Sequence, residues 1–139
     1  MGKKEPRGIR NNNPLNIRKG NNWLGERPNQ TDPAFEEFVS MEMGLRAGFK
    51  LLRNYITGYG GKKEKCNTIE AIVKRWAPPS ENNTTAYIRT ICNITGLHSR
   101  ERIFFTNREV MCKLVRAMVF QECGVFLSME VIQAGYDLV

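Results

Sequence analysis

Hydrophobic residues recur at three- and four-residue intervals over most of the chain beyond residue 40, which is the spacing of one face of an α-helix. The first such segment follows Ser40, a residue type favoured at the N-cap, and runs to about Ile56. Further helical segments follow at residues 67–76, from about residue 84 to Gly96, and at 106–123 before Gly124, and a last one begins at Ser128. The pattern therefore predicts about five helices.

Two of these helices start with a sequence typical of a capping box, in which the N-cap and the third helical residue exchange hydrogen bonds. Asn67 precedes Glu70 by three positions, and Thr106 precedes Glu109 in the same way. We therefore expect Asn67 and Thr106 to be the N-caps.

Residues 8–39 lack the helical period. They are rich in Asn, Gly and Pro and contain short pieces of extended character, LNIR, NWLGE and AFEEFV, which predict a small irregular β region. Residues 1–7 are expected to form a flexible basic arm, and residues 8–139 a single domain. The expected fold class is mainly α (α+β), with one core of the size that 139 residues allow.

One carboxylate stands out against the hydrophobic pattern. The helical stripe that starts at Met111 continues through Leu114, Val115, Met118 and Val119, and its next position is Glu122, in the last turn. Burial and the negative end of the helix dipole both favour the protonated form of a carboxyl group. A protonated glutamate is what acid-catalysed cleavage of a glycosidic bond requires. The alternative is a solvated Glu122, or one paired with a residue such as Arg116.

The charge of the chain points to an anionic partner. The net charge is +7 and the pI is about 9.5, which favours a nucleic acid, an anionic membrane surface or a bacterial cell wall. Basic residues are dispersed, so a nucleic-acid-binding module is not the preferred interpretation. No apolar run approaches the length of a membrane span.

Metal and cysteine chemistry receive little support. The four cysteines form no C-x-x-C pair, and His98 is the one histidine, so we expect no metal and no cofactor. The two aspartates, Asp32 and Asp137, are too few to favour a two-metal phosphoryl-transfer site.

Three longer stretches carry a family resemblance: RGIRNNNPLNIRKGNNWLGE, FEEFVSMEMGLRAGFKLLRNY and TIEAIVKRWAPPSENNTTAYIRTICNITG. Together they resemble a group of phage and prophage proteins with a lysozyme-like fold, often described as virion structural or lytic proteins. Those proteins are in turn similar to lytic transglycosylases and bacterial glucosaminidases. The resemblance implies a lysozyme-like domain that acts on peptidoglycan.

The resemblance also implies roles for particular residues. In the related glucosaminidases, an Asn-rich segment and a tryptophan lie on the β side of the cleft, and a tyrosine lines it from a helix. The corresponding substrate-binding residues here would be Asn11, Asn12, Asn13, Trp23 and Tyr87. The end of the β side would be formed by Phe35, Phe38 and Ser40.

The chain departs from those relatives in one respect. They carry the catalytic glutamate at the end of a helix that precedes the Asn-rich segment, and here only seven to ten residues precede that segment. A circularly permuted arrangement would supply Glu122 from the C-terminal side. Without it, the acid would be one of Glu26, Glu36, Glu37 and Glu81, and Asp32 or Glu26 could serve as a second carboxylate.

The sequence thus favours a peptidoglycan-degrading enzyme of phage or prophage origin, of the lytic transglycosylase or muramidase/glucosaminidase type. Its partners would be the bacterial wall and other virion proteins. The alternatives are a non-catalytic virion structural protein that binds the wall, and a basic nucleic-acid-binding module. The first residues do not resemble a signal peptide. We therefore expect synthesis in the bacterial cytoplasm and action at the wall after release or as part of a virion.

Overall fold

The computed structural model describes residues 5–58 and 65–139, and within these ranges the chain is mainly helical. Six helices are present there: α1 (Arg7–Arg10), α2 (Met41–Thr57), α3 (Ile69–Trp76), α4 (Thr84–Thr95), α5 (Arg108–Cys123) and α6 (Met129–Asp137). The five longer helices are those that the hydrophobic pattern predicts, and the short α1 is an addition. No helix in the described part of the chain is long and apolar enough to cross a membrane.

The helix ends follow local capping chemistry. The hydroxyl of Ser40 accepts a hydrogen bond from the Met43 N–H, and Ser128 caps α6 in the same way, as predicted. Gly96 and Gly124 end α4 and α5 in the left-handed conformation, with φ of 74° and 72°, which confirms both predicted stops.

The two expected capping boxes are wrong by one residue. Thr68, not Asn67, caps α3, and Asn107, not Thr106, caps α5. Each helix therefore begins one position later than expected. Glu70 and Glu109 are then the second rather than the third helical residue, too early to reach back to the N-cap N–H. Both instead pair with the lysine one turn further on, Lys74 and Lys113.

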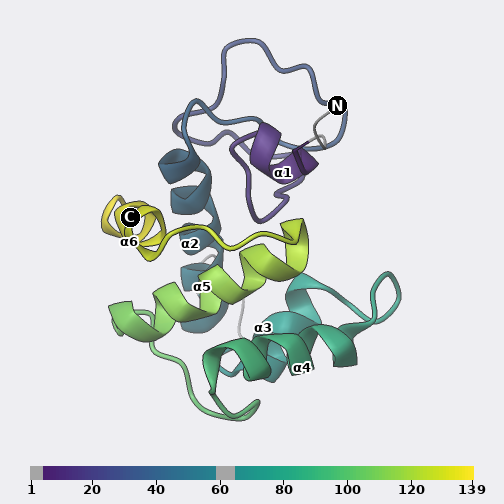
Figure 1. Ribbon diagram of the computed structural model, residues 1–139, viewed down its shortest axis with the longest axis vertical. Helices are drawn as coiled ribbons and strands as arrows, with labels where there is room; N and C mark the ends of the chain where they lie inside the picture. Colours follow the sequence, from purple (N-terminus) through teal and green to yellow (C-terminus); the bar gives the residue numbers. More distant parts are fainter. Residues whose placement is uncertain (1–4, 59–64) are drawn as a thin grey trace.

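The core is organised around α5, which crosses the middle of the molecule (Figure 1). Its predicted stripe is buried: Met111, Leu114, Val115, Met118 and Val119 are all fully inaccessible. In Figure 1, α2 runs from above α5 down behind it, with α6 at its left. Helices α3 and α4 lie below the C-terminal half of α5, and α1 lies above its C-terminal end. Gly135 allows α6 to approach α2 closely, because a Cβ atom there would lie 2.5 Å from Leu45 Cβ. The C-terminal end of α5 therefore lies between α1 on one side and the α3–α4 pair on the other.

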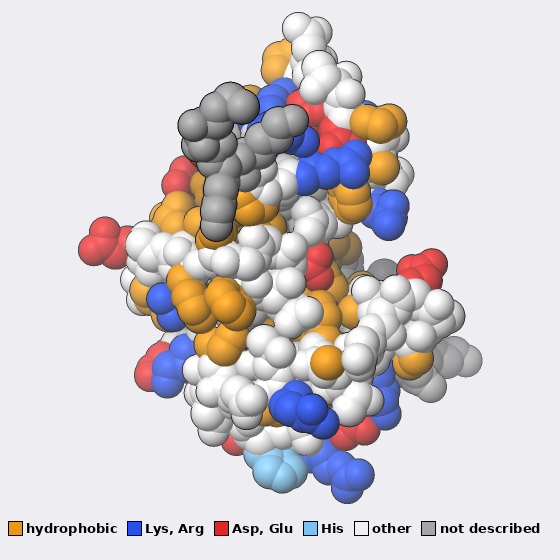
Figure 2. Space-filling view, turned by 45° about the vertical axis from the view of Figure 1, so that its right-hand side comes forward, with side chains coloured by type: hydrophobic (Ala, Val, Ile, Leu, Met, Phe, Trp, Pro, Cys, Tyr) orange, Lys and Arg blue, Asp and Glu red, His pale blue; other side chains and the backbone are white. Residues whose placement is uncertain are grey.

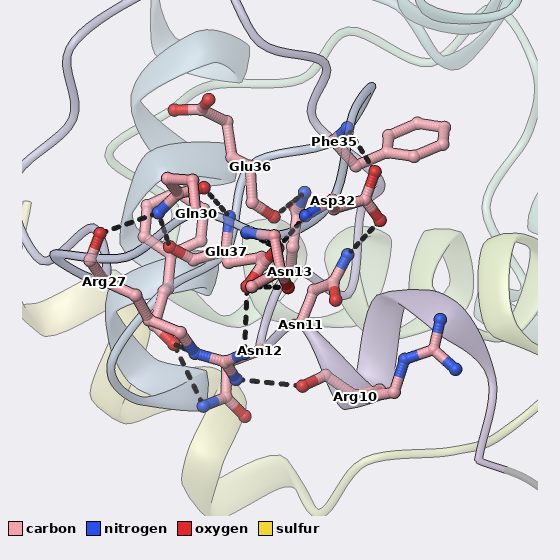
Figure 3. A network of polar contacts seen from close by, with 12 residues as sticks. Arg10, Asn11, Asn12, Asn13, Arg27, Gln30, Asp32, Phe35, Glu36 and Glu37 are labelled. Carbon is pink, nitrogen blue, oxygen red and sulfur yellow. Dashed lines mark hydrogen bonds and ion pairs between the residues drawn. The ribbon is translucent and has the colours of Figure 1, made fainter.

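The N-terminal region is irregular, as expected, but holds no sheet in the described residues. Its strand-like pairing consists of two isolated antiparallel bridges, Arg18 with Phe35 and Glu26 with Phe38. Hydrogen bonds from polar side chains to the backbone take the place of the backbone hydrogen bonds between strands that a sheet would have (Figure 3). The buried Asn13 side chain donates to the carbonyls of Ile17 and Glu36, at 2.9 and 3.0 Å, and accepts from the Ile17 N–H.

Two buried carboxylates hold this network together. Asp32 accepts hydrogen bonds from Arg7, Asn11 and backbone N–H groups. The Arg7 guanidinium holds the pKa of Asp32 well below its usual range, although burial opposes the shift. Burial also acts to raise the pKa of Glu37, but hydrogen bonds from the Asp32 and Thr31 N–H groups outweigh it, so that pKa is lowered.

Arg7 opens α1 and is paired with Asp32, so this end of the expected basic arm is part of the folded structure. Residues 1–4 of that arm lie outside the described residues.

Candidate active site

Glu122 lies in the last turn of α5, where three parts of the chain meet. Its Oε1 accepts a hydrogen bond of 3.0 Å from the side-chain amide of Asn16, in the N-terminal region. Its Oε2 accepts one of 3.0 Å from the hydroxyl of Tyr87, in α4. The side chain is half-buried rather than enclosed in the core. Arg116, the alternative partner from the sequence, instead donates to the Leu127 carbonyl and lies over the Phe126 ring.

The Glu122 carboxylate faces an open cavity of about 430 Å³. The space-filling view shows this face hollowed between the N-terminal region above and the α3–α4 part below, with acidic atoms in the hollow (Figure 2). The walls combine two aromatic rings, three charged side chains and small polar groups; the lining residues are Leu15, Asn16, Arg18, Phe35, Trp76, Ala77, Glu81, Asn82 and Glu122. Aromatic faces beside amide and carboxylate groups are suited to a sugar, which has both apolar and hydroxyl-bearing surfaces.

The N-terminal region is brought against α5 by close contacts next to the site. Gly8 is in α1, and a Cβ atom there would lie 2.7 Å from both Asn16 Oδ1 and Cys123 Sγ. The Cys123 thiol donates to the Pro14 carbonyl at 3.3 Å. Asn16 itself has a φ of 53°, a left-handed conformation that Asn tolerates better than most residues. These contacts fix where the Asn16 amide points.

Tyr87 is held as a hydrogen-bond donor. Its side chain is 4% exposed, and burial together with the negative charge of Glu122 raises the pKa of its phenol well above the usual value. The hydroxyl therefore keeps its proton across the physiological range, and it donates a hydrogen bond to Glu122.

The structure brings together only part of the predicted site. Glu122 and Glu81 line the cavity, and Tyr87 reaches it through Glu122. The three consecutive asparagines are not among the lining residues. Asn11 donates to Asp32, Asn12 adopts a left-handed φ of 52° and donates to the Phe38 carbonyl, and Asn13 ties the loop together. These contacts shape the N-terminal region.

The remaining candidates lie elsewhere in that region. Trp23 is half-buried and packs beside a small cluster of Ile17, Phe38 and Ala47. Its indole Nε1 is buried and has no hydrogen-bond partner among the described residues. Glu26 pairs with Phe38 through a backbone bridge, and Glu36 and Glu37 are buried. The Glu36 carboxylate points away from the hydrogen-bond network (Figure 3).

Sequence reasoning missed Asn16 and Arg18 as site residues. The signal was the alternation of apolar and polar residues in LNIR, although Asn16 is left-handed in the structure and the piece is not a regular strand. Leu15 and Ile17 are the buried members, with exposures of 1% and 6%, so the two polar residues between and after them face away from the core. The alternation predicts that Asn16 and Arg18 face away from the core. It does not predict that they face the C-terminal end of α5.

The site holds few groups for other chemistries. Asp32 is fully engaged with Arg7 and neighbouring N–H groups, so it does not provide a second carboxylate in the cavity. Within residues 5–58 and 65–139, no three His, Cys, Asp or Glu side chains are grouped so that they could hold a metal ion.

The fold and site thus define a mainly helical protein with a glutamate at the mouth of a polar cavity. No family model matches the chain. It is 41% identical over 122 residues to Protein P5 of Pseudoalteromonas phage PM2, a match that spans 85% of this chain and 71% of that protein. The chain belongs to the same family as this phage protein.

Proposed function

We propose that the chain is a peptidoglycan-degrading enzyme of phage origin that cleaves the glycan strand, with Glu122 as its general acid. The observation that carries the proposal is the position of Glu122: its carboxylate is at an open cavity and is held from both sides by Asn16 and Tyr87. A carboxyl group held in a fixed direction beside a cavity of sugar-binding character is what this chemistry needs.

The two hydrogen bonds fit the direction of charge transfer. As the protonated Glu122 gives its proton to the glycosidic oxygen, the sugar–oxygen bond breaks and negative charge develops on the carboxylate. The Asn16 amide and the Tyr87 hydroxyl already point at its two oxygens. Donors that are in place before the charge appears stabilise the transition state without a cost for reorganisation.

A mechanism with one essential carboxylate suits the cavity best. Glu81 also lines it, but is exposed in the loop before α4, and Asp32 is engaged elsewhere. The substrate's own hydroxyl or acetamido group would then assist bond cleavage, as in a lytic transglycosylase. With Glu81 or a water in that role, the enzyme would instead be a hydrolase of the muramidase or glucosaminidase type.

The relation to lysozyme-like enzymes would be a circular permutation. The Asn16–Glu122 hydrogen bond joins residues 106 positions apart, so the glutamate comes from the C-terminal side to the loop that follows the Asn-rich segment. The order of the parts along the chain would differ from that of the relatives, while the meeting of glutamate and loop would be the same.

The proposal is tested by comparing lysis of purified peptidoglycan by the wild type and by Glu122→Gln. The amide keeps the shape but cannot supply a proton, so lysis should fall by about 100-fold or more. Glu109→Gln is the matched control, because Glu109 is on the same helix, is exposed and pairs with Lys113. Loss of activity in Glu81→Gln with normal activity in Glu122→Gln would move the acid to Glu81.

A second candidate is a virion structural protein that binds the wall without cleaving it. The phage origin of its relative favours this alternative, since virions need such components. In that case the wild type would sediment with purified walls but release no fragments, and Glu122→Gln would behave like the wild type in both measurements.

A further inference from the structure

The cavity beside Glu122 contains one basic residue among its described lining residues, Arg18. Its backbone forms the antiparallel bridge with Phe35, and its guanidinium carbon lies 4.9 Å from the centre of the Phe35 ring. The same ring is also contacted by the guanidinium of Arg7, at 4.5 Å. Phe35 is therefore a platform that restricts the Arg18 side chain at the cavity wall.

Arg10 is exposed and is not among the cavity-lining residues, and two further arginines of this region are committed to the fold. Arg7 is bound by Asp32, and Arg27 donates to the Phe38 carbonyl and pairs with Glu37. Among the described residues, Arg18 has no carboxylate within 4.0 Å, and its side chain donates no hydrogen bond. The N–H donors of its exposed guanidinium are therefore available to solvent or to a ligand.

The geometry of the pair defines what Arg18 can recognise. Arg18 lies over the Phe35 ring and donates to no acceptor among the described residues, so the N–H groups of its planar guanidinium remain available. A planar fork of this kind matches a carboxylate, with which it makes two parallel hydrogen bonds. A neutral hydroxyl would use only one of these donors and none of the charge.

We propose that Arg18 forms a carboxylate-binding subsite next to Glu122, which selects glycans with an acidic substituent over neutral ones. This inference rests on the proposed function and gives it a substrate class. In peptidoglycan, the carboxylate would come from the stem peptide or from the lactyl ether of a sugar without a peptide. Glu81 shares the cavity and its negative charge repels an anion, so the bound carboxylate is directed to the Arg18 wall.

Binding is measured on Glu122→Gln protein, which cannot consume the probe. The first probe is a disaccharide–peptide fragment with free carboxylates, and the second is the same fragment with every carboxylate amidated. Calorimetry should show about tenfold tighter binding of the acidic fragment, the scale of one charge-assisted pair. A third probe, the peptide-free disaccharide with its lactyl carboxylate, distinguishes the two sources of the carboxylate. If it binds as tightly as the acidic fragment, Arg18 recognises the lactyl carboxylate. If it binds as weakly as the amidated fragment, Arg18 recognises a carboxylate of the peptide.

The test variant adds Arg18→Gln to this background. It should bind both fragments with the weaker affinity of the amidated one. Lys19→Gln is the matched control, since it removes the same charge one position away, from an exposed residue outside the cavity lining, and should keep the tenfold preference. Arg18→Lys should restore only part of it, because an ammonium lacks the planar fork.

The possible results separate this inference from the proposed function. Equal binding of the two fragments by the Glu122→Gln protein, or an intact preference after Arg18→Gln, would overturn the subsite, whether or not the wild type lyses walls. A preference that disappears with Arg18→Gln in a protein whose wild type releases no fragments would support the subsite and reject the enzyme.

Discussion

At the scale of single residues, the proposed role of Glu122 depends on hydrogen-bond partners that have no obvious relation to it in the sequence. Asn16 and Tyr87 are 106 and 35 positions away, and each gives one hydrogen bond. The position of Glu122 at the end of the buried stripe of α5 was predictable, because a carboxylate on an apolar helical stripe is conspicuous. Asn16 was not, because an asparagine near NNNP is explained equally well by its preference for turns.

Tyr87→Phe should reduce lysis by about tenfold, because it deletes one donor to Glu122 that is worth about 1.4 kcal/mol in the transition state. The buried ring keeps its packing, so the free energy of unfolding should change by no more than about 1.5 kcal/mol. Steady-state lysis rates and urea unfolding measure the two effects.

Tyr136→Phe is the control for the same atom deletion. The Tyr136 hydroxyl donates to the Phe105 carbonyl at 2.7 Å, away from the cavity. It should cost similar stability and leave the lysis rate unchanged. Equal losses of activity in the two variants would show that Tyr87 acts through stability alone.

At the scale of elements, α5 has two tasks in one sequence. Its middle supplies the central core stripe, and its last turn presents Glu122 to the cavity. The helices with a clear hydrophobic period and an N-cap residue were predictable from the sequence. Two of them begin one residue later than predicted, because Thr68 and Asn107 are the N-caps instead of the capping residues just before them. The irregular character of the N-terminal region was also predictable, but its polar network was not, because that order comes from long-range side-chain contacts such as Arg7 with Asp32.

The contact between α2 and the Asn-rich loop gives a prediction at this scale. Gly44 is buried in α2, and a Cβ atom there would lie 1.8 Å from the Asn12 carbonyl oxygen. Backbone must therefore move, so Gly44→Ala should cost about 3 kcal/mol or more of unfolding free energy, at the upper end for overpacking. The shift would also displace the loop that holds Asn16, so lysis should fall at temperatures where the variant remains folded.

Gly124→Ala is the comparison for Gly44→Ala. A Cβ atom at Gly124 meets nothing within 4 Å, and its cost comes only from the φ of 72°, about 1–2 kcal/mol. Thermal unfolding should rank Gly44→Ala as clearly the less stable. The reverse order would show that the loop adapts to α2 without strain.

At the scale of the whole molecule, the buried carboxylates predict how stability depends on pH. The folded pKa of Asp32 is below its unfolded value of about 3.9, so its contribution is fully present above the unfolded value and is lost as the pH falls from there through the folded pKa. The lowered pKa of Glu37 acts in the same direction. The free energy of unfolding should therefore decrease from about pH 5 downwards, measured by urea titration at several pH values.

Asp32→Asn should be less stable than the wild type at pH 7 and should show a weaker decrease on acidification. Asp137→Asn is the control, because Asp137 also has a lowered pKa from its pairing with Arg108, but both side chains are exposed. Solvent screens such a pair, so this variant should keep nearly the full acid dependence. An equal flattening in both variants would argue against a special role for the buried network.

The Asn16–Glu122 contact also has a consequence during translation. The ribosome makes Asn16 early and Glu122 only after most of the other residues, and a nascent chain that ends before residue 122 contains the loop and Tyr87 but no acid. The helices that precede α5 can begin to form while the cavity is still incomplete. Under the proposed function, premature termination products would therefore carry no lytic activity, and synthesis would release no active fragment before the chain is nearly complete.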